Sequence, residues 1–129
     1  KRIPQMRFNK ILIADDDPIA RELMLEVFTG RGFDVYLACN GYEVESILED
    51  ETFDLLILYN NMPPGPTGIE LCQRHSTEIP VVIISGDPVH EESEAAGALR
   101  FIQRPVPISE LVSIIKSLQL GLEPGPDSL

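Results

Sequence analysis

Four polar residues that could act together follow short apolar runs of this sequence. They are Asp15, Asp16, Ser85 and Arg104. Adjacent carboxylates repel each other, so Asp15 and Asp16 need a compensating cation, and their hard oxygen atoms suit Mg²⁺. Each acid taken alone could also be a solvated loop residue. A hydroxyl and a cation aimed at the same carboxylates make a joint site the stronger interpretation.

A phenol ends another apolar run at a comparable place. The segment Leu55–Tyr59 is followed by the polar turn Asn60-Asn61. Open α/β sheets carry their chemistry at the carboxyl ends of such strands. A phenol with an ordinary pKa near 10 is neutral at pH 7 and is a poor nucleophile there. Tyr59 therefore limits the reactions that this edge can support.

Five apolar runs alternate with five segments of helical character, which predicts a doubly wound α/β fold. Strands are expected at Ile11–Ala14, Phe33–Ala38, Leu55–Tyr59, Val81–Ser85 and Leu99–Gln103. Helices are expected from Pro18 to about Gly30, from Asn40 onward, and over Thr67–His75, Pro88–Ala96 and Ser109–Leu120. Continuous hydrophobicity in three of the strands indicates a parallel sheet covered on both faces. We predict a flavodoxin-like three-layer sandwich with strand order 2-1-3-4-5.

Composition predicts one domain over residues 10–120, an N-terminal arm over residues 1–9 and a linker or disordered tail over residues 121–129. The net charge of −11 argues against a nucleic-acid-binding surface, which needs clustered basic residues. No apolar run approaches the length of a membrane span. Cys39 and Cys72 have no metal-ligand spacing and favour a reducing, cytoplasmic environment.

The residues from about Lys10 to Leu120 resemble the receiver domain of two-component response regulators. The matching features are Asp15-Asp16, Asn61-Met62-Pro63, Ser85, Gly97-Ala98, Phe101 and Arg104-Pro105, in that order. The resemblance implies a phosphotransfer switch, in which an aspartate ending the third strand receives a phosphoryl group while Mg²⁺ is held nearby. It also implies that Ser85 and Phe101 occupy the switch positions and that Arg104-Pro105 is a cis peptide.

Two residues depart from the family pattern at its centre. Tyr59 stands at the phospho-acceptor position, and Arg104 replaces the family's lysine. An acyl phosphate cannot form on a phenol, and the loss of a carboxylate removes a metal ligand. Only a weak or vestigial Mg²⁺ site is expected, at Asp15, Asp16 and the carbonyl of Asn61.

Other residues near the site have simple structural interpretations. We expect Arg104 to pair with Asp15 or Asp16, since guanidinium suits carboxylates. Tyr59 is expected to fill the pocket, with its hydroxyl bonded to one of those three residues.

Residues on the following loop and strand have similar interpretations. Asp87 is expected to cap the helix beginning at Pro88, rather than to act as a displaced acceptor. Phe101 is expected to be a buried core aromatic, and His75 and His90 are expected on the surface.

These features predict a phosphorylation-independent receiver-like module (a pseudo-receiver) that is not an enzyme and acts through protein–protein contacts. It could bind a separate partner, form a homodimer or hold an attached output domain. Its contact surface could be the face of the fourth helix, fifth strand and fifth helix, or the first helix. The alternative is a phosphotransfer-competent receiver that uses a nonstandard acceptor with Mg²⁺. Flavin or nucleotide binding is disfavoured, because no glycine-rich phosphate loop follows the first strand.

Overall fold

The computed structural model describes residues 7–121, in which five strands alternate with five helices. The strands are β1 (Lys10–Ala14), β2 (Asp34–Ala38), β3 (Leu55–Tyr59), β4 (Val81–Ser85) and β5 (Arg100–Gln103). The helices are α1 (Pro18–Gly30), α2 (Gly41–Asp50), α3 (Gly68–His75), α4 (His90–Ala95) and α5 (Ile108–Gln119). Every predicted strand and helix is present. Residues 122–129 of the predicted tail and residues 1–6 of the predicted arm lie outside the described part.

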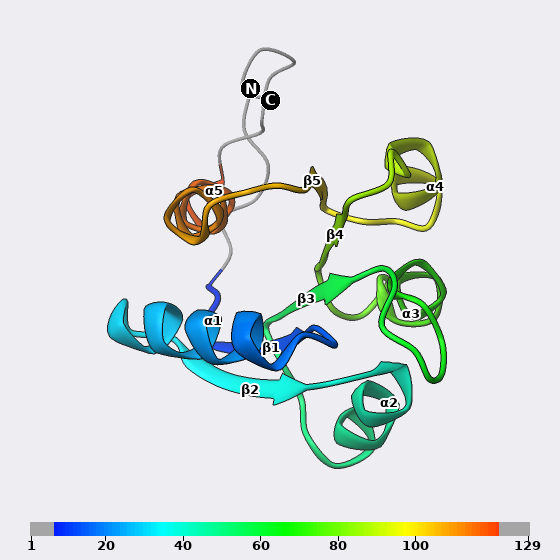
Figure 1. Ribbon diagram of the computed structural model, residues 1–129, viewed down its shortest axis with the longest axis horizontal. Coiled ribbons are helices and arrows are strands. Elements are labelled where there is room, and N and C mark those ends of the chain that lie inside the picture. The colour runs from blue at the N-terminus through cyan, green and yellow to red at the C-terminus, as the bar shows by residue number, and fades with distance from the viewer. Residues whose placement is uncertain (1–6, 122–129) are drawn as a thin grey trace.

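The sheet is parallel and has the predicted order β2-β1-β3-β4-β5. One layer of helices, α1 and α5, covers one face, and α2, α3 and α4 cover the other (Figure 1). Because all strands run the same way, their carboxyl ends meet at one edge. The strand order reverses between β1 and β3, so the residues that follow these two strands flank the switch point.

The core consists of two apolar clusters, one on each face of the central strands. Ile11, Ile13 and Ile57 face the α1–α5 side, while Leu12 and Leu56 face the opposite side. This alternation follows from the two-residue period of a strand and accounts for the uniformly apolar sequences of β1, β3 and β4.

The predicted N-terminal arm is partly wrong, because Phe8 belongs to the core and is only 1% exposed. The amides of Asn9 and Lys10 both donate to the carboxylate of Asp54, which joins this segment to the start of β3. The aromatic ring and these two hydrogen bonds tie the chain down before β1 begins.

Helix α1 carries two apolar rows, of which the sheet covers only one. Met24 and Phe28 are buried, whereas Ile19 is 71% exposed and Leu23 is 47% exposed. The periodicity of the sequence does not distinguish the rows, because both repeat at helical spacing. Packing against the sheet decides which row is buried.

Helix α4 is shorter than predicted, with six residues beginning at His90 rather than at Pro88. The expected cap by Asp87 is wrong, since the N-cap is Val89 and no side chain caps the helix. The hydroxyl of Ser93 donates to the carbonyl of Val89 at 2.7 Å. That internal bond, together with the burial of Ser93, holds the short helix.

The proline-rich loop between β3 and α3 packs closely against the start of α2. A side chain added at Gly41 would collide with the backbone of Pro66, and Gly65, with φ of +102°, lies against Tyr42. Thr67 then begins α3 with a capping box to Glu70. The two helices are thereby positioned by one loop that leaves the carboxyl end of β3.

We predict that Gly41→Ala destabilises the fold by about 1–3 kcal/mol, because an added methyl group overpacks the contact with Pro66. The matched control is Gly30→Ala, at a helical position where an added Cβ would have no neighbour within 4 Å. That change should stabilise the protein by about 0.4–1 kcal/mol. Urea unfolding of both variants measures the difference. Equal stability of the two variants would show that the contact between Gly41 and Pro66 is not tight.

Candidate functional site

The ends of four neighbouring strands bring the predicted site residues to one edge of the sheet. Ala14 is in register with Leu58, so Asp15 follows β1 beside Tyr59 at the end of β3. Ser85 ends β4, and its carbonyl accepts the backbone amide of Arg104 at 2.8 Å. The parallel register alone therefore gathers side chains that are far apart in the sequence.

Asp15 is fully buried, and only one of its carboxylate oxygens has a hydrogen-bond partner. Its Oδ1 accepts the backbone amide of Asp17 at 3.0 Å, while its Oδ2 is buried without a partner. Its backbone is also held, because the amide donates to Ala38 O and the carbonyl accepts from Arg21. A buried carboxylate oxygen without a hydrogen-bond partner is unfavourable for folding, so Asp15 lowers the stability of the domain.

Burial raises the pKa of Asp15, and the neighbouring Asp16 carboxylate raises it further. The hydrogen bond from Asp17 and the positive charge of Arg104 act in the opposite direction but do not cancel the effect of burial. Asp16 is exposed to solvent. The two acids therefore differ in environment: the Asp15 carboxylate is buried, and the Asp16 carboxylate is exposed to solvent.

Tyr59 is buried, and the guanidinium of Arg104 lies over its ring, with Cζ 4.7 Å from the ring centroid. The predicted ion pair of Arg104 is wrong, since no salt bridge joins it to Asp15 or Asp16 among the described residues. The predicted bond of the Tyr59 hydroxyl is also absent within this part of the chain. A planar guanidinium stacks well on an aromatic face, and this contact replaces the expected pairing.

Burial raises the pKa of Tyr59 to about 12, and the negative charges of Asp15 and Asp17 add to the effect. The charge of Arg104 lowers this pKa without compensating for the other causes. The phenol is therefore protonated throughout the physiological range. A neutral phenol under a fixed cation is a poor nucleophile for any electrophile that reaches this edge.

A hydrogen bond joins the two loops that follow β3 and β4 at this edge of the sheet. The side-chain amide of Asn61 donates to Asp87 Oδ2 at 3.3 Å, and the amide of Asp87 donates to Ser85 Oγ at 3.1 Å. Asn60 accepts the amide of Ile69 at 3.0 Å, which fixes the turn below. The sequence alone did not predict the hydrogen bond between Asn61 and Asp87. The available signal was that each of these residues lies two positions after the end of its strand.

Phe101 is half-buried rather than buried as predicted, and its ring lies 5.8 Å from the ring of His90 on α4. Phe101 packs partly against the core cluster on the side of α2, α3 and α4. The Arg104–Pro105 peptide is cis, as expected. His90 is exposed as predicted, but His75 is half-buried, and its Nε2 lies 2.5 Å from Glu45 Oε1 on α2.

The acidic residues at this edge do not fit an ordinary Mg²⁺ site. Within residues 7–121 there is no group of three or more His, Cys, Asp or Glu side chains that could hold a metal ion. Asp15 Oδ2 is a free acceptor, but its neighbours are an exposed acid, a phenol and a guanidinium. The side-chain amide nitrogen of Asn61 donates a hydrogen bond to Asp87. The atom of Asn61 that was predicted to bind the metal is its carbonyl oxygen.

Comparison with known proteins identifies the fold and the ancestry of this edge. The family model described as the response regulator receiver domain matches residues 11–116. The chain belongs to this family. Sporulation initiation phosphotransferase F of Bacillus subtilis is 34% identical over 118 residues, which cover 86% of this chain and 94% of that protein.

Other relatives extend beyond the receiver domain. The response regulator MprA of a Mycobacterium species is 31% identical over 127 residues, covering 92% of this chain but only 55% of that protein.

The receiver domain of a response regulator from Methanospirillum hungatei is 26% identical with a TM-score of 0.79, covering 88% of this chain and 94% of that one. In the described part of this receiver domain, no helix has the length and hydropathy of a membrane span.

We predict an energetic coupling of about 0.5–1 kcal/mol between Arg104 and Tyr59, which is typical of a cation–π contact near a surface. The double-mutant cycle uses Arg104→Gln and Tyr59→Leu, with stability measured by urea unfolding. Arg31→Gln, at an exposed arginine after α1, is the matched control and should show no coupling to Tyr59→Leu. Additive effects of Arg104→Gln and Tyr59→Leu would contradict the stacking.

We predict that Asp15→Asn stabilises the domain by roughly 1–2 kcal/mol at pH 7, because it removes an unpaired buried charge. The folded state raises the pKa of Asp15, so ionisation of this carboxyl opposes folding. The gain should be fully present above the raised pKa and should disappear as the pH falls toward the ordinary aspartate value. Asp16→Asn, at the exposed neighbour, is the control. A gain independent of pH would contradict the assignment to this carboxyl.

Proposed function

We propose that this receiver domain is a phosphorylation-independent signalling module that acts through protein–protein contacts and is not itself an enzyme. The observation that carries the proposal is the guanidinium of Arg104 stacked over the buried Tyr59 ring, at the carboxyl end of β3. This is the strand end where the family resemblance places an acceptor aspartate.

The chemistry of Tyr59 supports the proposal. A phenol whose pKa is raised to about 12 is protonated at neutral pH and cannot form an acyl phosphate. Arg104 lies over the ring and occupies the space above the strand end. A phosphoryl group would have to displace the contact between Arg104 and the ring of Tyr59.

We propose that this domain keeps only a weak, vestigial Mg²⁺ site. Asp15 and Asp16 remain as oxygen ligands, and the carbonyl of Asn61 is the third. The missing carboxylate at position 59 and the positive charge of Arg104 both oppose a divalent cation. The bound ion would otherwise supply charge neutralisation for phosphoryl transfer, which Arg104 cannot replace because it faces the phenol.

The proposed partner is another protein or an output domain attached to the receiver, with a homodimer as a further possibility. The chain spans about half the length of MprA, in keeping with a receiver that belongs to a longer regulator. Two free cysteines, Cys39 and Cys72, and the family relationship support a cytoplasmic location. We propose no nucleic-acid or membrane binding for this domain.

The decisive measurement is the intact mass of the chain after incubation with acetyl phosphate and Mg²⁺. We expect no phosphoryl adduct, because the site offers a neutral phenol in place of a carboxylate. The variant carrying both Tyr59→Asp and Arg104→Lys is the positive control and should gain one phosphoryl group, which hydroxylamine removes.

A stoichiometric adduct on the unmodified chain would establish the alternative, a phosphotransfer-competent receiver with a nonstandard acceptor. Asp87→Asn and Tyr59→Phe would then identify the acceptor. Loss of a hydroxylamine-labile adduct in Asp87→Asn assigns it to that carboxylate. Loss of a hydroxylamine-stable adduct in Tyr59→Phe assigns it to the phenol.

A further inference from the structure

The edge of the sheet formed by β2 is open. β2 is the outermost strand on the side opposite β5, and its neighbour in the sheet is β1 (Figure 1). Val35, Tyr36 and Leu37 are each half-buried in the middle of this strand, although α1 and α2 contact it. An edge strand of this kind presents backbone N–H and C=O groups that can pair with another strand.

The hydrogen bonds of β2 show which of its backbone groups face outward. The amide of Asp34 donates to the carbonyl of Asn9, just before β1, at 2.8 Å. The carbonyl of Ala38 accepts the amide of the residue that follows β1, at 3.1 Å. Because backbone groups alternate between the two edges of a strand, Val35 and Leu37 direct their amide and carbonyl groups away from the sheet.

The outward amides at the two ends of β2 already have partners within the chain. The amide of Phe33 donates to the carbonyl of Phe28 at 3.2 Å. The amide of Cys39 donates to Glu43 Oε1 at 2.9 Å. Between these two ends, the outward groups belong to the middle of the strand. The segment available for pairing is therefore short, and its ends are defined.

We propose that β2 binds the β2 strand of a second copy of this chain, in antiparallel orientation about a two-fold axis at Tyr36. In that register Val35 lies opposite Leu37 of the second copy, and these two residues exchange N–H···O bonds. Exchanging the two copies gives the same pairing, so the segment is complementary to itself. The inference rests on the proposed function as a protein-contact module and names the partner as a second copy.

The side chains of β2 suit this register. Tyr36 meets its own counterpart at a pair without hydrogen bonds between the strands, where side chains approach most closely. Its ring already packs edge-on to Phe53, with centroids 5.3 Å apart, and Lys10 Nζ lies 4.8 Å from its centroid. A ring held in this way loses little conformational entropy on pairing. On the other face, Val35 and Leu37 extend the apolar cluster of the α1–α5 side.

Within the paired strands, the antiparallel register places no like charges opposite each other. Asp34 lies opposite Ala38 of the second copy, and within its own chain it is in register with Lys10 on β1. The same register brings the exposed Arg31, which precedes β2, toward the exposed Glu43 of the second copy. The whole chain carries a net charge of −11, so long-range repulsion opposes the dimer and salt screens it.

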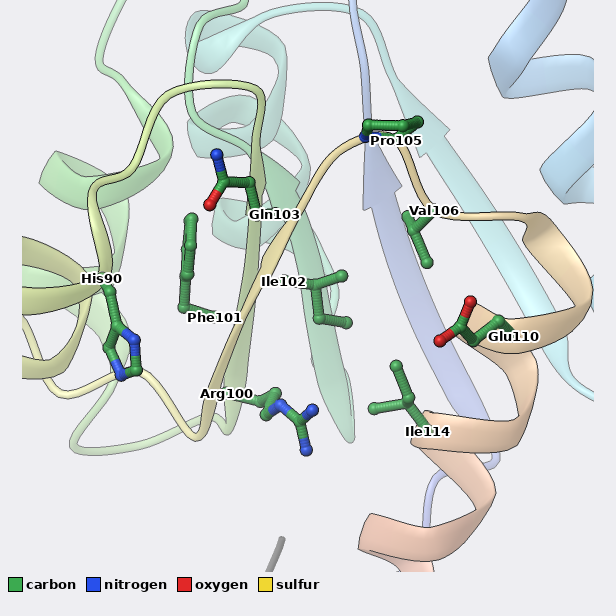
Figure 2. A pocket seen from close by; sticks show the side chains of 9 residues that line it. All are labelled: His90, Arg100, Phe101, Ile102, Gln103, Pro105, Val106, Glu110 and Ile114. Carbon is green, nitrogen blue, oxygen red and sulfur yellow. The ribbon is translucent and has the colours of Figure 1, made fainter. Parts of the chain in front are cut away.

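The other edge strand, β5, provides a matched control. Gln103 also directs its backbone outward, because the amide of the adjacent Arg104 donates to Ser85 O on β4. Figure 2 shows Glu110 and Ile114 of α5 beside this strand, where they line a hollow of about 350 Å³. A proline at an outward position of either edge strand removes no hydrogen bond of the sheet.

The test is the molecular mass of the full chain in solution, measured by sedimentation equilibrium over a range of concentrations. We expect a reversible dimer that strengthens when salt screens the net charge. Val35→Pro should weaken it about tenfold or more, because each copy loses an N–H donor at the interface. Gln103→Pro should leave the dimer unchanged. A monomer under all conditions, or a dimer weakened only by Gln103→Pro, overturns the proposal.

Disulfide trapping tests the register without a proline in the strand. In a chain that also carries Cys39→Ser, Tyr36→Cys places the introduced thiols opposite each other on the two-fold axis, at a Cα separation that a disulfide spans. We expect mild oxidation to give a covalent dimer. Asp34→Cys is the control, because its thiol would face Ala38 of the second copy, and it should cross-link about tenfold more slowly. Equal rates for the two variants overturn the register.

Treatment with acetyl phosphate and Mg²⁺ separates this inference from the proposed function. A dimer without a phosphoryl adduct supports both. A dimer that forms only with an adduct supports the pairing of β2 and overturns phosphorylation independence. No dimer and no adduct overturns the pairing and leaves the proposed function standing.

Discussion

The burial of the Asp15 carboxylate at the carboxyl edge of the sheet is the constraint on which this site depends. A charged oxygen without a partner is unfavourable in a dry environment, and burial correspondingly raises the pKa of Asp15. The positive charge of Arg104 lowers that pKa through space, while its guanidinium lies over the ring of Tyr59. Arg104 thus acts both on the acid, through its charge, and on the aromatic ring, through direct contact.

This balance explains why a receiver fold can keep its architecture while the centre of its site changes. The strands need only apolar side chains and parallel pairing, and these do not involve the residue at position 59 beyond its burial. Tyr59 adds apolar area to the core beside Ile57, and Arg104 covers its outer surface. Fold and site therefore make separable demands on the sequence, which is why family membership alone does not establish phosphotransfer.

The same separation applies to the connections around the site. The bridge between Asn61 and Asp87 joins two loops across the edge, and the contact of Pro66 with Gly41 fixes the first of those loops against α2. On the far side, Phe101 is half-buried beside His90 of α4. The loops after β3 and β4 are thus hydrogen-bonded to each other at the site, while the aromatic side chain on β5 is only partly covered.

The sequence by itself determined the fold, because periodicity and apolar runs are local properties. The continuous hydrophobicity of β3 and β4 predicted burial on both faces, and strict alternation of strands and helices left few topologies. It also identified Asp15, Tyr59, Ser85 and Arg104 as residues that one sheet edge brings together, since parallel strands end on the same side.

Only the tertiary structure decided how those side chains use their shared space. Arg104 could satisfy either a carboxylate or an aromatic face by residue type, and the geometry at the end of β5 selected the ring of Tyr59. Likewise, Ile19 and Met24 both lie on apolar rows of α1, yet only Met24 is buried. Such choices depend on distances between segments remote in sequence, which local patterns do not encode.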